Sequence, residues 1–254
     1  MKTIAFYNNK GGVGKTSSAM AFAQILHDDY NKKVLFLDLD QQANGSSLFG
    51  CYNPDDMTTA DLLMAPSKDK IITQVIKHSQ FGVDVVPASK NLEVAELKVK
   101  LDMSRPQHNR LKNQLSAVKN QYDYCIIDCP INVPVILMNV FTVADEILVP
   151  VTADKSAIDG LSDTIEKIEN AKEEYNDNLE FKGCFVIMAN PQTNLHKQIT
   201  EILRSVCGPK FFTNYTRYSV KVRESSYKCP LTVYRPAKNI AEDYRKIVNE
   251  YLYL

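Results

Sequence analysis

The segment KGGVGKT, residues 10–16, decides the class of fold. It follows an apolar run over residues 3–7 that predicts a short buried strand, and it precedes a helical pattern over residues 16–30. Glycines that end in a Lys-Thr pair between a strand and a helix are typical of a loop that binds nucleoside triphosphates. Backbone N–H groups of such a loop surround the phosphates, Lys15 would neutralise them, and the Thr16 hydroxyl would ligate Mg²⁺. The alternative is a glycine-rich turn that binds nothing, and the complete pattern in one window argues against it.

A second lysine distinguishes this loop from the standard one. The common spacing places glycine where this chain has Asn9, and Lys10 stands five residues before Lys15. From the residues alone, Lys10 is either a solvated loop lysine or a second cation directed at phosphate. The solvated interpretation is the commoner one for an arbitrary lysine, so the spacing by itself leaves both open.

The run NNKGGVGKT, residues 8–16, resembles the deviant phosphate loop of the ParA/MinD ATPases. The resemblance implies that the ligands are ATP and Mg²⁺ and that the ATP-bound protein is a homodimer. It also implies that Lys10 crosses the dimer interface to the partner's nucleotide and, with Lys15, acts in catalysis by stabilising the charge that develops during hydrolysis. The nucleotide contacts that it implies in this loop are Lys10, Gly11, Gly12, Val13, Gly14, Lys15, Thr16 and Ser17.

Composition and cysteine usage set the broad class. A chain of 254 residues with 44% hydrophobic content can bury one core, and no linker is visible, so we expect a single domain over residues 1–254. The six cysteines form no C-x-x-C pair and the four histidines show no ligand spacing, which favours a reducing cytoplasm over a disulfide framework or a transition-metal site. The strand expected beside Met1 leaves no room for a signal peptide, and the longest apolar run, residues 133–144, is too short to cross a bilayer.

Charge is unevenly distributed along the chain, although the formal net charge is zero. Residues 145–180 hold eleven acidic and three basic side chains. Residues 197–246 reverse this balance, with eleven basic side chains against four acidic ones. We therefore expect a basic surface in the last quarter of the chain, which either binds a polyanion or is a solvated face without a ligand.

Patterns of buried strands alternate with helical patterns along the whole chain. Continuous hydrophobic runs between helices indicate an α/β fold in which helices cover both faces of a mostly parallel sheet, as in P-loop NTPases. The predicted strands are residues 3–7, 33–38, 83–87, 124–128, 147–151 and 184–189, with a further short strand at 210–213. The predicted helices are residues 16–30, 58–63, 69–77, 91–101, 105–120, 134–142, 158–175, 193–206 and 237–251.

Two aspartates stand at the end of the second predicted strand. Ligands of a parallel sheet bind beyond the carboxyl ends of its strands, so Asp38 and Asp40 would face the phosphate loop if the first two strands are neighbours. Such carboxylates hold the water ligands of magnesium or polarise an attacking water, and a plain Asp cap before a loop is the alternative. The segment resembles the family's LDLDPQGN motif, with Gln41 in place of proline. The resemblance assigns Asp40 to the attacking water, as a catalytic residue, and Asp38 to the magnesium shell.

A third aspartate ends the strand CIID, residues 125–128. A hydrophobic strand that ends in aspartate is typical of a Walker B element, whose carboxylate accepts a hydrogen bond from a magnesium-bound water. The predicted metal site therefore consists of Thr16, Asp38 and Asp128, with both aspartates acting through water.

Weaker matches extend the resemblance toward the end of the chain. Asn190 follows a predicted strand at the place where the family has an asparagine that contacts adenine. Residues 220–224 and the Pro230-Leu231 pair resemble the family's NVRLSEAP…KPV segment. Arg217 stands at the arginine of the family's IPR motif, with Thr216 in place of the proline.

The overall pattern is most similar to that of the ParA/Soj group, which partitions plasmids or chromosomes. The resemblance implies that the ATP-bound dimer binds DNA of any sequence on the nucleoid, and that a ParB-like centromere-binding protein stimulates hydrolysis. The predicted DNA contacts are Lys197, Arg217, Lys221 and Arg223, because Lys and Arg on phosphates give affinity without reading bases.

Other roles remain as alternatives. A MinD-like ATPase that positions a membrane or cargo complex would need a basic amphipathic tail, whereas the last helical pattern includes Glu242, Asp243 and Glu250, so we expect no membrane binding. An electron carrier like nitrogenase reductase would need cysteines that share a cluster between subunits, but Cys125 and Cys129 flank the Walker B strand. A DNA-binding regulator would need an N-terminal DNA-reading domain, for which we expect no room.

Overall fold

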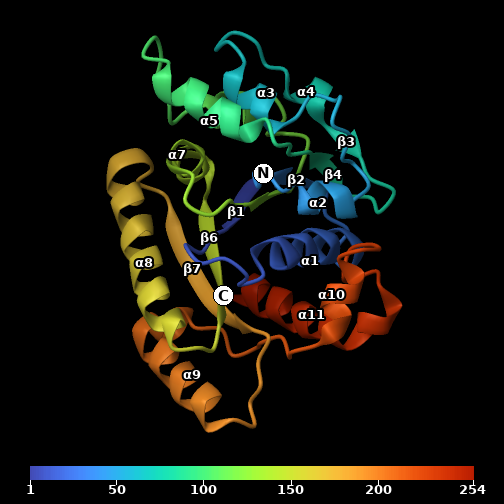
Figure 1. Cartoon of the computed structure of the whole chain (residues 1–254), viewed down its shortest axis with the longest axis vertical. Helices are drawn as coiled ribbons and strands as arrows, with labels where there is room; N and C mark the ends of the chain where they lie inside the picture. Colours follow the sequence, from blue (N-terminus) through green and yellow to red (C-terminus); the bar gives the residue numbers. More distant parts are fainter.

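Seven strands form one sheet at the centre of the molecule (Figure 1). The computed structural model describes residues 1–254. The strands lie in the order β3-β4-β2-β5-β1-β6-β7, and every neighbouring pair is parallel except β3 with β4. Their bounds are β1 (Lys2–Phe6), β2 (Val34–Asp38), β3 (Lys77–His78), β4 (Asp84–Val86), β5 (Tyr124–Asp128), β6 (Glu146–Thr152) and β7 (Glu180–Ile187). The predicted mostly parallel α/β fold is therefore confirmed.

Helices cover both faces of this sheet. Figure 1 shows α1 and α11 on one side of the sheet and α7 and α8 on the other. The bounds of the helices are α1 (Lys15–Asp28), α2 (Asn44–Leu48), α3 (Thr59–Met64), α4 (Ile72–Val75), α5 (Leu92–Leu101), α6 (Arg110–Leu115), α7 (Pro134–Val143), α8 (Ser156–Tyr175), α9 (Asn194–Cys207), α10 (Val220–Ser225) and α11 (Lys238–Tyr253), with the 3₁₀ turns η1 (Gly208–Lys210) and η2 (Arg235–Ala237). No helix combines the length and the apolar character needed to pass through a bilayer.

Alternate side chains of the central strands fill two separate cores. Ile4 and Phe6 of β1 enter the core under α1 and α11, whereas Ala5 and Tyr7 enter the core under α7 and α8. The first core contains many aromatic rings, and Phe22 of α1 packs edge-on against Phe6 with the ring centroids 4.9 Å apart. Because both faces of the strands are buried, their sequences are continuously hydrophobic rather than alternating.

The C-terminal helix is held in place by two tyrosine hydroxyls. On α11, the Tyr244 hydroxyl lies 3.1 Å from Ser18 Oγ of α1, and the Tyr251 hydroxyl donates to Glu146 of β6 at 2.6 Å. Lys2 forms an ion pair with the same glutamate at 2.7 Å. These buried polar contacts fix the position of α11 on α1 and on the sheet.

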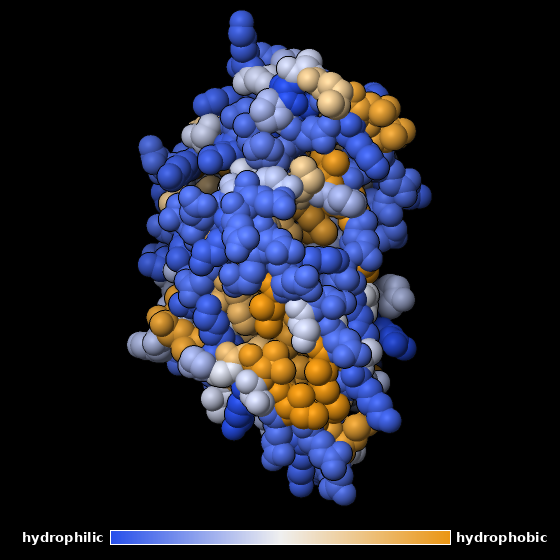
Figure 2. Space-filling view, turned by 90° about the vertical axis from the view of Figure 1, so that its left-hand side faces the viewer, coloured by the Kyte–Doolittle hydropathy of each residue, from blue (hydrophilic) through white to orange (hydrophobic).

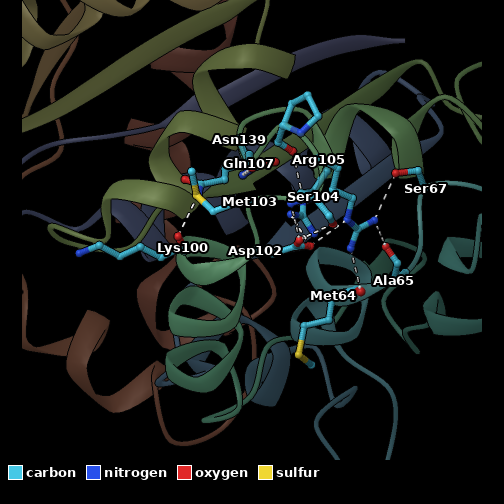
Figure 3. A network of polar contacts seen from close by, with 12 residues as sticks. Met64, Ala65, Ser67, Lys100, Asp102, Met103, Ser104, Arg105, Gln107 and Asn139 are labelled. Atoms are coloured by element: carbon cyan, nitrogen blue, oxygen red, sulfur yellow. Dashed lines mark hydrogen bonds and ion pairs between the residues drawn. The ribbon is translucent and has the colours of Figure 1, made fainter.

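The helix predicted over residues 105–120 is wrong at both ends, since α6 covers only Arg110–Leu115. Arg105 turns away from α6 and donates to the carbonyl oxygens of Met64 at 3.1 Å and Ala65 at 2.6 Å, where α3 ends (Figure 3). Its Nε also pairs with Asp102 at 3.2 Å. The guanidinium therefore donates hydrogen bonds to carbonyl oxygens that the end of α3 leaves unpaired. This contact holds Arg105 against α3, so the segment before α6 does not continue the helix.

Two further predicted elements differ from the structure. Residues 69–77 form only the short helix α4, because Lys77 and His78 pair with β4 as the antiparallel strand β3. The strand predicted at 210–213 is a 3₁₀ turn followed by one isolated bridge from Phe211 to Cys184. The turn begins at Gly208, whose φ of +56° is a left-handed conformation that ends α9.

Both edges of the sheet are short or covered. At one edge, β3 has two residues, and Lys77 pairs with Asp56 at 2.9 Å. At the other edge, β7 is bridged by Phe211 and, beyond its end, by Arg217, which pairs with Ala189. Few backbone groups are therefore available to a further strand.

Candidate nucleotide site

The glycine loop lies between β1 and α1, as predicted. Gly12 has a φ of +73° and Gly14 a φ of +66°, and Gly14 is the N-cap of α1. A Cβ on Gly14 would lie 2.5 Å from the Ile187 side chain, so glycine allows the end of β7 to touch the loop. No side chain caps α1 and no acidic residue lies in its first turn. Its first N–H groups and its positive dipole end are thus available to an anion.

Lys15 lies inside the loop rather than in solvent. The residue is 7% exposed, and its Nζ donates to the carbonyl oxygen of Lys10 at 3.0 Å. Burial lowers the pKa of Lys15, and the attraction of Asp128 works in the opposite direction. The ammonium is therefore close both to the loop and to Asp128, a carboxylate of the predicted metal site.

The aspartates meet at one level of the sheet, although not through the expected strand order. The condition set in the sequence analysis, that the first two strands are neighbours, is not met, because β5 lies between β1 and β2. In the parallel register, Asp128 of β5 is paired with Phe6 on one side and with Asp38 on the other. The central position of β5 thus brings Asp128 next to the phosphate loop and Asp38 next to Asp128.

Asp128 is a buried acid whose carboxyl oxygens make no close hydrogen bond. Both of its carboxyl oxygens are inaccessible and have no partner in the protein. Burial, and after it the nearby Asp38, raises the pKa of Asp128 well above its usual range, although the Thr16 hydroxyl and the Lys15 ammonium act in the opposite direction. A buried carboxylate without a partner is unfavourable, so the site is electrostatically suited to a cation.

Asp38 and Asp40 have different surroundings. Asp38 is fully buried and accepts hydrogen bonds from the Ser46 amide at 2.8 Å, the Ser46 hydroxyl at 2.7 Å and the Asp40 amide at 3.1 Å. Burial nevertheless raises the pKa of Asp38 to about 6. Asp40 is only partly buried and lines an open groove of about 530 Å³ together with Ile131 and Glu96. Asp40 is therefore the aspartate that a water molecule can reach.

Lys10 forms an ion pair within its own chain. Its Nζ lies 2.8 Å from both carboxyl oxygens of Asp154 and 2.5 Å from the Ser156 hydroxyl. Partial burial works against ionisation, but hydrogen bonds from Lys10, Thr152 and Ser156 hold the pKa of Asp154 well below its usual range. Asp154 and Ser156 are not among the predicted site residues. They follow the end of β6, and the rule that ligands bind beyond strand ends was the signal that could have found them.

The predicted adenine contact lies on the other side of the loop from the aspartates. Asn190 is exposed and comes three residues after the end of β7. The segment around Arg217 runs beside it, since the Tyr218 amide donates to the Ala189 carbonyl at 3.1 Å. No interaction of the Asn190 side chain bears on its predicted role, which stays a prediction.

The four predicted DNA contacts differ in availability. The Arg217 guanidinium is paired with Asp243 at 2.7 Å, and the Lys221 ammonium is paired with Glu224 at 2.8 Å. Arg223 and Lys197 are exposed and have no ion pair. Lys197 lies on α9 and Arg223 on α10, and Figure 1 shows these helices on opposite sides of α11. The basic stretch of sequence therefore does not form one continuous patch on the protomer.

Three features define the class of P-loop nucleotide-binding proteins. A glycine loop lies at the N-terminus of α1, a lysine is enclosed in that loop, and aspartates stand at the ends of neighbouring strands.

Comparison with known proteins identifies the family. A family model described as an AAA domain, AAA_31, matches residues 1–181. The sporulation initiation inhibitor protein Soj of Bacillus subtilis is 32% identical over 252 residues, which cover 98% of this chain and 97% of that protein. The chromosome partitioning protein ParA of Caulobacter vibrioides is 29% identical over 254 residues, which cover 98% of this chain and 93% of that protein. The chain belongs to this family of ParA- and Soj-type proteins, which confirms the predicted resemblance.

A solved structure supports the fold. Cobyrinic acid a,c-diamide synthase from Mycobacterium smegmatis, with bound ADP and magnesium, has a TM-score of 0.82 at 21% identity, and the match covers 98% of this chain and 92% of that one. At this identity the likeness concerns the fold alone, and that fold carries more than one chemistry.

The buried acids predict a pH-dependent penalty on stability. A carboxyl whose pKa is raised by folding destabilises the fold when it is ionised, so the penalty is complete above the folded pKa and absent below the unfolded value. Asp128→Asn should therefore raise the free energy of unfolding of the ligand-free protein by ~1–3 kcal/mol at pH 8 and by nearly nothing at pH 4. Urea unfolding at both pH values measures this, with the partly exposed Asp40→Asn as the control. An equal effect at both pH values would contradict the assignment.

Proposed function

We propose that this chain is a Mg²⁺-dependent ATPase whose ATP-bound dimer partitions DNA. The observation that carries the proposal is Asp128, a fully buried acid that makes no close hydrogen bond and lies near the Thr16 hydroxyl and the enclosed ammonium of Lys15. The Mg²⁺ of a Mg²⁺–ATP complex would provide a cation beside Asp128. The phosphates of the same complex would be attracted by Lys15 and by the N-terminus of α1.

The residues present fit a magnesium ion. The Thr16 hydroxyl would ligate it directly, and Asp128 and Asp38 would hold its water ligands, since oxygen donors are what this ion prefers. When bound, magnesium would supply positive charge that neutralises the negative charge developing on the phosphates. Asp38 is already held by Ser46, so its part would be to orient the site rather than to move.

Asp40 is the residue that would position the attacking water. It lines the groove beside Ile131, and its Oδ1 accepts a hydrogen bond from the Gln42 amide at 3.0 Å, which fixes its direction. Its second oxygen is left to accept a hydrogen bond from a water aligned with the terminal phosphate. Water then attacks phosphorus, the bond to the bridging oxygen breaks, and ADP and phosphate leave.

Lys10 would change partners when two ATP-bound chains associate. In the single chain, Asp154 and Ser156 hold its ammonium. This pairing supports a resting state in which Lys10 is kept away from the phosphates. Dimerisation would replace Asp154 by the partner's phosphates, which carry more charge, and hydrolysis would then depend on the dimer.

The location of charge favours DNA binding on the side of α10. Figure 2 views the molecule from the side of α8 and shows a mostly hydrophilic surface with an apolar patch on its lower half. The sequence of α8 is strongly acidic, and α9 exposes Leu195, Ile202 and Val206, so this side offers DNA little positive charge. The exposed basic residues without an ion pair near α10, η2 and the start of α11 are Arg223, Lys228, Arg235 and Lys238.

The partition role also rests on the relatives. ParA of Caulobacter vibrioides is named as a chromosome partitioning protein, and it is similar to this chain over almost its whole length. The proposal includes a ParB-like partner that binds a centromere and stimulates hydrolysis, and a nucleoid-bound state with ATP. A MinD-like role at a membrane is the second candidate, which the DNA experiment below separates.

The two loop lysines should have separable functions. Lys10→Ala should leave ATP binding in place but lower hydrolysis by at least about tenfold, because it removes charge from the partner's site. Lys15→Ala should weaken ATP binding itself. Asp154→Asn is the matched variant, and it should keep hydrolysis because it only releases Lys10. Calorimetric ATP titration and phosphate release at several protein concentrations measure these effects, and identical defects in both lysine variants would remove the case for a cross-subunit lysine.

Asp40→Ala should separate ATP binding from turnover. We expect the variant to bind ATP normally, to hydrolyse it about a hundredfold more slowly and to accumulate as a dimer, because only the water loses its partner. Light scattering after gel filtration with ATP and Mg²⁺ measures the dimer. The exposed Asp55→Ala serves as control. Turnover near that of the wild type would show that Asp40 does not position the water.

DNA binding should require ATP and the α10 side. With ATP, the wild type should bind random duplex DNA, and the affinity should fall steeply with salt. Arg223→Glu should weaken this binding about tenfold or more, whereas Lys197→Glu on α9 should weaken it much less. Fluorescence anisotropy measures both variants. Binding to vesicles with anionic lipids, without ATP-dependent DNA binding, would instead select the MinD-like role.

A further inference from the structure

The end of β7 forms one wall of the nucleotide site. The Ile187 side chain contacts the position of Gly14 in the phosphate loop. In the sheet, β5 and β2, with the metal-site aspartates, lie on one side of β1, and β6 and β7 lie on the other. A triphosphate that directs its terminal phosphate and metal toward Asp128 therefore extends its nucleoside toward the residues after Ile187. This step rests on the proposed function.

A second segment is hydrogen-bonded to this wall. The Thr216 amide donates to the Val186 carbonyl at 3.0 Å, and the Ala189 amide donates to the Thr216 carbonyl at 2.7 Å. The Thr216 hydroxyl accepts from the Met188 amide at 3.2 Å. Met188 itself has a φ of +52°, a left-handed conformation that is rare for methionine and needs support from its surroundings. Thr216 supplies that support.

The supporting segment is in turn held by one buried carboxylate on α11. Asp243 is 4% exposed and accepts three hydrogen bonds from Arg217, from its amide at 3.1 Å, its Nε at 2.8 Å and its Nη2 at 2.7 Å. The carboxylate thus fixes both the backbone and the side chain of the residue after Thr216. Because the pair is charge-assisted and bidentate, it is directional as well as strong. The contacts of Tyr244 and Tyr251 give α11 a fixed position from which to act.

We propose that Asp243 acts through Arg217 as a positioning residue that sets the wall against the base and thereby determines base specificity. The ligand class is a purine nucleoside triphosphate, and the discriminating contacts lie in residues 188–190. This assignment gives Arg217 a role in nucleotide selection rather than in DNA binding, since its guanidinium is already committed to Asp243.

The test compares ligands with and without a base. Dissociation constants of ATP, GTP and inorganic tripolyphosphate are measured by calorimetry for the wild type and for Asp243→Asn. We expect the variant to lose about tenfold in ATP affinity and most of its preference for ATP over GTP, while tripolyphosphate binding stays within about twofold. A purely structural defect would weaken all three ligands together, so that result would overturn the proposal.

Glu250→Gln is the matched control. Glu250 lies on the same helix and accepts hydrogen bonds from the Thr213 and Asn214 amides at 2.5 and 2.8 Å. These two residues come just before the supporting segment that begins at Thr216. Its ATP-to-GTP ratio should equal that of the wild type, and an equal loss of preference in Glu250→Gln and Asp243→Asn would refute the specific role of Asp243.

Arg217→Lys is a second, milder variant that tests the same contact if Asp243→Asn does not fold. It keeps the charge beside Asp243 but loses the bidentate geometry, so it should show the same change in ratio to a smaller extent. A wild-type ratio in both Asp243→Asn and Arg217→Lys would refute the inference and leave the ATPase proposal intact. A wild type that binds no ATP at all would refute the proposed function, and the inference with it.

Discussion

A buried carboxylate that the protein itself does not neutralise is the constraint on which the nucleotide site depends. Asp128 ends the central strand β5, and neither of its oxygens makes a close hydrogen bond. Lys15 provides a positive charge nearby, but its ammonium donates a hydrogen bond to the backbone carbonyl of Lys10 in the loop. The folded chain thus keeps at this position an acid whose ionised form is favoured only when a cation lies beside it.

Local patterns in the sequence predicted the parts of this site, and long-range pairing decided how they meet. The loop, the strand of Asp128 and the aspartates at the end of β2 could all be identified because each motif is contiguous. The insertion of β5 between β1 and β2 could not be identified, since strand order depends on contacts between distant segments. For the same reason the partner of Lys10 was missed, because Asp154 lies 144 residues further along the chain.

The distribution of charged residues along the sequence predicted the charge of the folded surface only in part. The basic stretch after residue 197 suggested four DNA contacts, but folding pairs Arg217 and Lys221 with carboxylates from the same stretch. It also separates Lys197 on α9 from Arg223 on α10. Whether a charged residue is free depends on its neighbours in space. A helix such as α11 can hold one arginine through Asp243 while the surface beside it keeps several free cations.

The edges of the sheet have a consequence for association between copies of the chain. An open edge strand would allow copies to join by backbone pairing and to grow into β-linked fibres. Here one edge is the two-residue strand β3, and the other is bridged by Phe211 and Arg217. Strand addition therefore offers no route to higher-order association. Association between copies is left to side-chain contacts, which need no matched backbone register.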